Sequence, residues 1–119
     1  MNRLYKNLQD LLEQKIGLYE NFIQLLNEEW KCVTEYSYDG LQDIIAKKND
    51  QVMQIQALEN SRSSLMKKIS ANLKVGQSGL TLRKLIQFKD NPYRINLSKC
   101  RKKLLSKIEK INIYDRDYL

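Results

Sequence analysis

The chain has 119 residues, of which 42 % are hydrophobic and 29 % charged, with a net charge of +7 and a mean hydropathy of −0.59. This length suits one domain, and the sequence has no run of about 20 apolar residues that would insert into a bilayer. Without histidine the chain lacks the commonest general base and metal ligand, and it shows no phosphate-binding loop, nucleophile motif or zinc spacing. We therefore expect no enzyme activity, no catalytic residues, no cofactor and no metal site.

Charge is distributed unevenly along the chain. Residues 1–60 carry six basic and ten acidic side chains, whereas residues 61–119 carry fifteen basic and four acidic ones. The first dozen residues mix charged groups with leucines, which argues against a signal peptide. Cys32 and Cys100 have no metal-ligand spacing, so we expect free thiols in a reducing, cytoplasmic location.

The strongest periodic signal lies near the N-terminus. Steps of three and four residues reach nine apolar positions in succession: Tyr5, Leu8, Leu12, Ile16, Tyr19, Ile23, Leu26, Trp30 and Val33. Such a stripe predicts one long amphipathic helix over about residues 3–36. We expect Trp30 to pack in the core, the alternative being contact with a partner. Gly17 either permits close approach of another helix or is merely tolerated.

A second helix is predicted over about residues 40–73. The segment 35–40 breaks the first pattern, and Asp39 with Gln42 three residues later suggests an N-cap and capping box. The short connection makes the two helices antiparallel neighbours. Lys48, Glu59 and Arg62 interrupt the apolar stripe of this helix, so we expect part of the first helix to be covered by another helix.

The remaining chain reads as a loop over 74–80, a short helix over 81–88 and a last helix over about 92–114. Gly76 and Gly79 indicate the loop, and Pro92 suits the first turn of the last helix. The predicted fold is therefore all-α, a single helical domain over residues 1–119. It has three main helices: a long antiparallel hairpin and a shorter C-terminal helix packed alongside.

Basic residues are concentrated between Lys99 and Lys110. Three interpretations are open: a solvated face, a contact for an acidic protein, or a nucleic-acid site. Nucleic acid is the least favoured, because the lysines point around much of the helix and the first half of the chain is acidic.

Several segments together resemble one family. They are LLEQKIGLYE (11–20), LLNEE (25–29), YDGLQDI (38–44), KKNDQV (47–52) and LLSKIEKIN (104–112). Their order is similar to that of the FlgN-type flagellar export chaperones, and the resemblance covers nearly the whole chain.

The resemblance implies a cytoplasmic chaperone that binds the C-terminal helices of hook–filament junction proteins. It would keep them unassembled and deliver them to the flagellar type III export gate, by helix-in-groove recognition. In the last helix we assign Leu97, Leu104 and Ile108 to the core. The expected partner contacts are Leu105, Ile111, Ile113, Tyr114, Tyr118 and Leu119.

An alternative from another functional class is a coiled-coil scaffold or adaptor that self-associates, because a long apolar stripe also suits a second copy. Whether the chaperone itself forms a homodimer is left open by the sequence.

Overall fold

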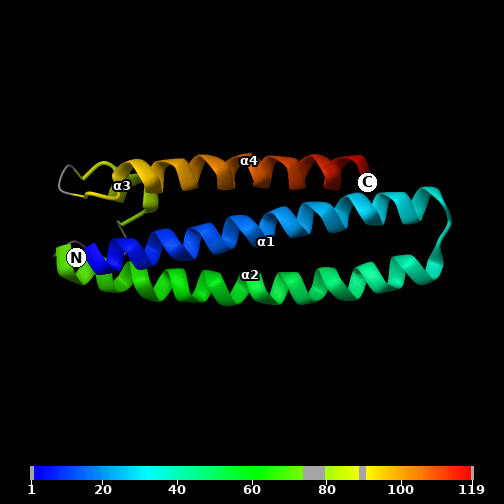
Figure 1. Ribbon diagram of the computed structural model, residues 1–119, viewed down its shortest axis with the longest axis horizontal. Coiled ribbons are helices and arrows are strands. Elements are labelled where there is room, and N and C mark those ends of the chain that lie inside the picture. Colours follow the sequence, from blue (N-terminus) through cyan, green and yellow to red (C-terminus); the bar gives the residue numbers. More distant parts are fainter. Residues whose placement is uncertain (1, 74–79, 89–90, 119) are drawn as a thin grey trace.

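The computed structural model describes residues 2–73, 80–88 and 91–118, of which 113–118 are described as backbone only. It contains α1 (Asn2–Thr34), α2 (Tyr38–Leu73), α3 (Leu82–Ile86) and α4 (Arg94–Tyr118), and the described residues include no strand (Figure 1). The all-α prediction is confirmed. The last helix runs four residues beyond the expected end at 114, and all of the predicted 74–80 loop except Leu80 lies outside the described residues.

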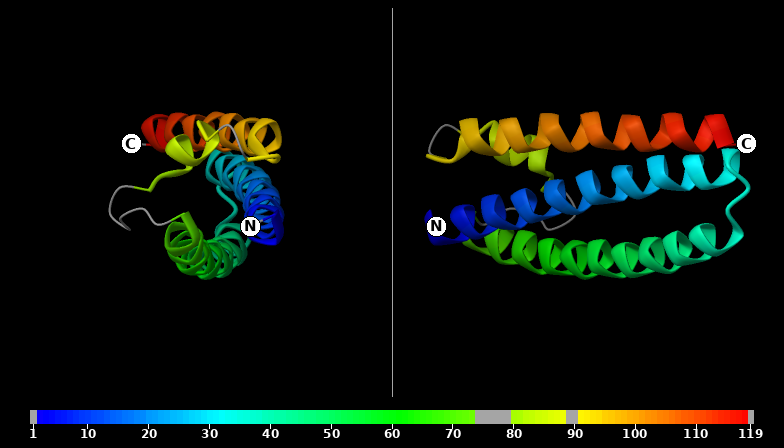
Figure 2. Two further views of the ribbon diagram at one scale, coloured as in Figure 1. Left: turned by 90° about the vertical axis from the view of Figure 1, so that its left-hand side faces the viewer. Right: turned by 45° about the vertical axis from the view of Figure 1, so that its right-hand side comes forward.

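The helices form an elongated body that measures 55 by 22 by 21 Å. Helices α1 and α2 are antiparallel, and α4 lies along α1 (Figure 1). Viewed from the end, α1 occupies a corner between α2 and α4, and α3 lies near the open end of the hairpin (Figure 2). The predicted hairpin with a helix alongside is therefore confirmed. None of the described helices combines the length and apolarity needed to cross a bilayer.

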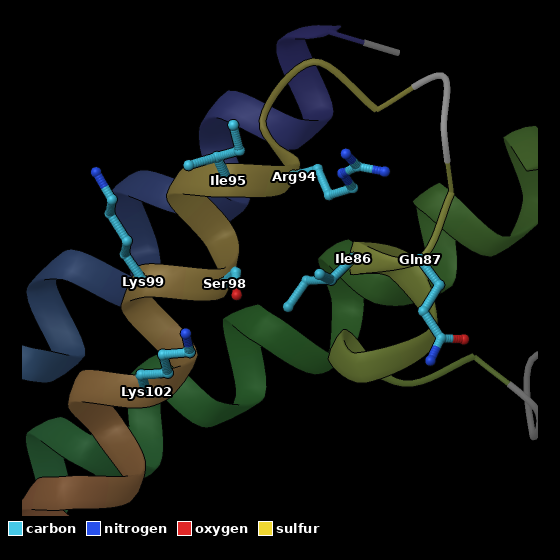
Figure 3. Close-up of a pocket in the computed structure, with 7 residues that line it drawn as sticks. All are labelled: Ile86, Gln87, Arg94, Ile95, Ser98, Lys99 and Lys102. Atoms are coloured by element: carbon cyan, nitrogen blue, oxygen red, sulfur yellow. The ribbon is translucent and has the colours of Figure 1, made fainter.

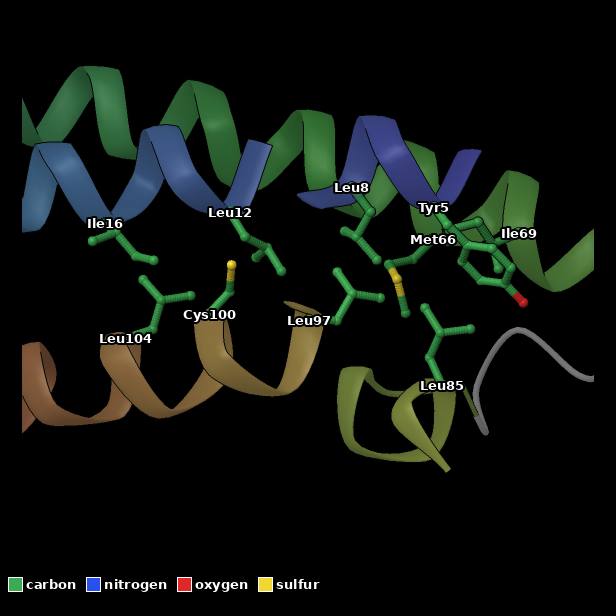
Figure 4. Close-up of a cluster of buried hydrophobic side chains, with 10 residues drawn as sticks. All are labelled: Tyr5, Leu8, Leu12, Ile16, Met66, Ile69, Leu85, Leu97, Cys100 and Leu104. Atoms are coloured by element: carbon green, nitrogen blue, oxygen red, sulfur yellow. The ribbon is translucent and has the colours of Figure 1, made fainter. Parts of the chain in front are cut away.

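The core is concentrated at the open end of the hairpin, where all four helices contribute side chains (Figure 4). Leu85 of α3 and Leu97 of α4 are fully buried there, and Leu104 of α4 is also buried. The predicted core positions of Leu97 and Leu104 are therefore confirmed. The whole cluster consists of Tyr5, Leu8, Leu12, Ile16, Met66, Ile69, Leu85, Leu97, Cys100 and Leu104. Both cysteines are free, and burial raises the pKa of the Cys100 thiol.

The connection between α1 and α2 differs in detail from the prediction. The amide of Ser37 donates to the Cys32 carbonyl (2.9 Å) and that of Tyr36 to the Val33 carbonyl (3.3 Å), the two bonds of a Schellman turn. The predicted N-cap at Asp39 is wrong: α2 already begins at Tyr38, and the Ser37 carbonyl accepts its first helical bond, from Leu41.

The predicted core position of Trp30 is also wrong, since 43 % of this residue is exposed. Its neighbour Glu29 is buried instead and accepts a hydrogen bond from Lys48 Nζ of α2 at 3.0 Å. Adjacent residues of a helix point about 100° apart. Because Glu29 faces α2, Trp30 turns toward the solvent-exposed side.

Gly17 makes no close approach to another part of the described chain, since a Cβ built there meets no atom within 4 Å. Replacing Gly17 by alanine should therefore gain helix propensity without a clash. We expect Gly17→Ala to raise the free energy of unfolding by about 0.5–1 kcal/mol in urea denaturation. A lower stability for this variant would contradict the prediction.

Candidate functional site

An apolar groove runs between α2 and α4, with α1 as its floor. Its volume is about 380 Å³. It is lined by Tyr19 and Phe22 from α1, by Val52, Ile55 and Gln56 from α2, and by Ile108 and Ile111 from α4. Apart from the hydroxyl of Tyr19, the amide of Gln56 is the only polar side-chain group in this lining. Such a surface suits the apolar face of another helix.

The groove exists because α3 covers only one end of the space beside α1. Leu85 of α3 packs with Met66 of α2 and Leu97 of α4 at the open end of the hairpin (Figure 4). Farther along, no described element covers the groove, so 51 % of Val52 and 39 % of Ile108 remain exposed. Three long helices therefore leave the place of the fourth helix of a bundle vacant along this stretch.

Ion pairs stand beside the two aromatic rings of the groove floor. Lys15 Nζ lies 2.8 Å from Glu59 Oε2 and 5.6 Å from the centre of the Tyr19 ring. Lys48 Nζ lies 3.0 Å from Glu29 Oε2 and 5.7 Å from the centre of the Phe22 ring. Two of the three charges that interrupt the stripe of α2, Lys48 and Glu59, therefore pair with charges of α1, on either side of the apolar lining.

Glu59 also accepts a hydrogen bond from Arg62 Nε at 3.0 Å. The Arg62 guanidinium, against the opposing effect of burial and together with Lys15, lowers the pKa of the Glu59 carboxyl from 4.5 to about 2. A carboxyl with a lowered folded-state pKa stabilises the fold above its unfolded-state pKa and loses that contribution as the pH falls.

Above pH 4.5, the free energy of unfolding of the wild-type protein should therefore exceed that of Glu59→Gln by on the order of 1 kcal/mol. The expected difference is this small because solvent screens the partly exposed ion pair. The difference should shrink as the pH falls from 4.5 toward 2. Urea unfolding of both proteins across this range measures it. A difference that stays constant with pH would contradict the prediction.

The sequence-predicted contacts fall in different places. Ile111 lines the groove, and so does Ile108, whose predicted core position is wrong because no described element covers it. Leu105 is 49 % exposed and does not line the groove. The side chains of Ile113, Tyr114 and Tyr118, and the whole of Leu119, lie outside the described residues.

The remaining lining residues were missed, although the sequence held a signal for some of them. The interruptions at Lys48 and Glu59 bracket the segment 52–56, which supplies one wall of the groove. The stripe predicted for the first helix includes Tyr19. Neither pattern showed that α4 would leave this stretch open.

A second hollow, of about 550 Å³, lies where α3 meets α4 (Figure 3). Its lining includes only two aliphatic side chains, Ile86 and Ile95, alongside the basic residues Arg94, Lys99 and Lys102. Although larger than the groove, it is less suited to an apolar helix face. It takes in part of the basic cluster, whose three interpretations stay open.

Comparison with known protein families identifies a family for this chain. The model of the FlgN protein family matches residues 1–116. No curated protein and no solved structure matches the chain. The family match spans α1, α2 and α3 and nearly all of α4, and so includes every residue of the groove. The chain therefore belongs to the FlgN family of flagellar export chaperones.

Proposed function

We propose that the protein is a cytoplasmic chaperone that binds the C-terminal helices of hook–filament junction proteins and delivers them to the flagellar type III export gate. The observation that carries this proposal is an open apolar groove with helical walls, in a chain of the FlgN family. A helical segment that self-assembles in the filament must be kept covered before export, and a vacant helix position offers that cover.

In the proposed complex, an amphipathic helix of the substrate takes the place of the fourth helix. Apolar residues at i, i+3, i+4 and i+7 would face Tyr19 and Phe22, with Val52 and Ile108 on the two sides. Each square ångström of apolar surface removed from water contributes about 25 cal/mol. The exposed parts of Val52 and Ile108 are surface that this binding would cover.

The C-terminal end of α4 is part of the proposal. Ile111 is the last groove residue of α4 whose side chain is described. We keep Leu105, Ile113, Tyr114, Tyr118 and Leu119 as proposed substrate contacts, on the basis of the family resemblance.

Calorimetric titration with a synthetic C-terminal segment of a junction protein tests the proposal. We expect one segment to bind per chain, with a gain of helical circular dichroism because the segment orders on binding. A scrambled segment of the same composition is the control and should not bind. Absence of binding by the folded protein would contradict the proposal.

Sedimentation of the chain alone at several concentrations tests the alternative of a self-associating scaffold. A stable dimer would favour the scaffold.

A further inference from the structure

The turn between α1 and α2 holds a tyrosine in a backbone conformation that favours glycine. Tyr36 has φ = 57°, in the left-handed region, at the position of a Schellman turn that glycine most often occupies. The residue is 93 % exposed, so burial of its ring does not offset the backbone strain. Strain of this kind is commonly kept at sites of function. A contribution to the stability of the fold therefore does not explain why a tyrosine occupies this position.

Tyr36 belongs to an apolar hollow at the tip of the hairpin. The hollow has a volume of about 330 Å³ and is lined by Cys32, Val33, Tyr36, Ser37, Tyr38 and Leu41. Tyr38 is 71 % exposed, and its hydroxyl accepts a hydrogen bond from Gln42 Nε2 at 2.8 Å. This bond restrains the Tyr38 ring before any partner arrives. Tyrosine is among the residue types that most often dominate binding energy at protein interfaces, and restraint before binding lowers the entropy cost of association.

The hollow has an acidic surround, although the whole chain carries a net charge of +7. Between residues 28 and 43 there are five carboxylates and one basic residue, Lys31. Glu28, Glu35 and Asp39 are exposed, whereas Glu29 is buried and paired with Lys48, and Asp43 is paired with Lys47. An acidic surface attracts lysine and arginine and repels phosphate groups, so it disfavours nucleic acids and anionic membranes.

We propose that the tip of the hairpin, with Val33, Tyr36 and Tyr38 at its centre and carboxylates around them, binds a basic amphipathic segment of another protein. Apolar side chains of that segment enter the hollow, and its lysines or arginines pair with Glu28, Glu35 and Asp39. None of these residues lines the groove assigned above to the substrate. The tip is therefore a second interaction surface, independent of the proposed substrate site.

The test uses the full chain and a fluorescein-labelled peptide of about 18 residues with repeated Leu-Lys-Lys-Leu units, a basic amphipathic helix. Fluorescence anisotropy should show binding that weakens as salt rises, because the attraction is electrostatic. Tyr36→Gly should weaken this binding about tenfold and yet raise the melting temperature by about 3 °C, since glycine relieves the strain. A structural role alone would not couple higher stability to lower affinity.

Met53→Ser is the matched control, because Met53 is as exposed as Tyr38 but lies on α2 outside the hollow. It should leave the peptide affinity unchanged, and a peptide with glutamine in place of lysine should not bind. Equal affinity of Tyr36→Gly and wild type would overturn the proposal, as would a melting temperature that does not rise. Self-association of the wild type that Tyr36→Gly abolishes would assign the tip to a second copy and overturn the commitment to another protein. Binding of an oligonucleotide that Tyr36→Gly abolishes would overturn it in favour of nucleic acid.

Discussion

The double variant Val52→Glu/Ile108→Glu is expected to bind the C-terminal segment of a junction protein about 100-fold more weakly than wild type. The two residues lie on α2 and α4, on either side of the groove. A bound helix would enclose both new carboxylates against apolar surface without a partner. At about 1–2 kcal/mol for each uncompensated polar group, the pair accounts for a loss of that size.

Both positions are about half exposed, so the double variant should fold and keep the thermal stability of wild type within a few degrees. Met53→Glu/Ile95→Glu is the matched control, since it also places one carboxylate on α2 and one on α4, at exposed positions outside the groove. The control should retain the affinity of wild type in calorimetric titration. Equal losses in the two double variants would show that net charge, not the groove, governs binding.

Leu97→Ala is expected to lower the free energy of unfolding by about 3 kcal/mol. Leu97 is fully buried between the hairpin and α3, where it belongs to the cluster that includes Leu8 and Leu85. Truncation leaves a cavity that helices anchored on three sides cannot easily close. Because a domain of this size has a total stability of only about 5–15 kcal/mol, the loss is a large fraction of it.

Urea unfolding followed by circular dichroism measures this loss, and Leu105→Ala is the control on the same helix. Leu105 is half exposed, so its truncation should cost less than about 0.5 kcal/mol. Similar losses for the two variants would mean that α4 is not anchored through Leu97. Since α4 supplies one wall of the groove, we also expect Leu97→Ala to weaken binding of the substrate segment.

The sequence by itself determined the helices and much of the core. Apolar residues at the period of a helix predicted α1 and α2, and the break at residues 35–40 separated them, because these signals depend only on local geometry. The same reasoning placed Leu97 and Leu104 of α4 in the core. The segments that resembled FlgN-type chaperones lie within the 1–116 match to that family.

Only the tertiary structure decided which side of each stripe is covered. The apolar stripe of a helix shows which face is apolar, but it does not show how much of that face a neighbouring helix covers. Glu29 is buried in place of Trp30 because it pairs with Lys48 of the opposite helix. Ile108 is exposed in the groove because the five-residue helix α3 is too short to reach it. This exposure depends on how α2, α3 and α4 are arranged around α1. The groove is therefore a property of the packing of the helices and not of any one helix.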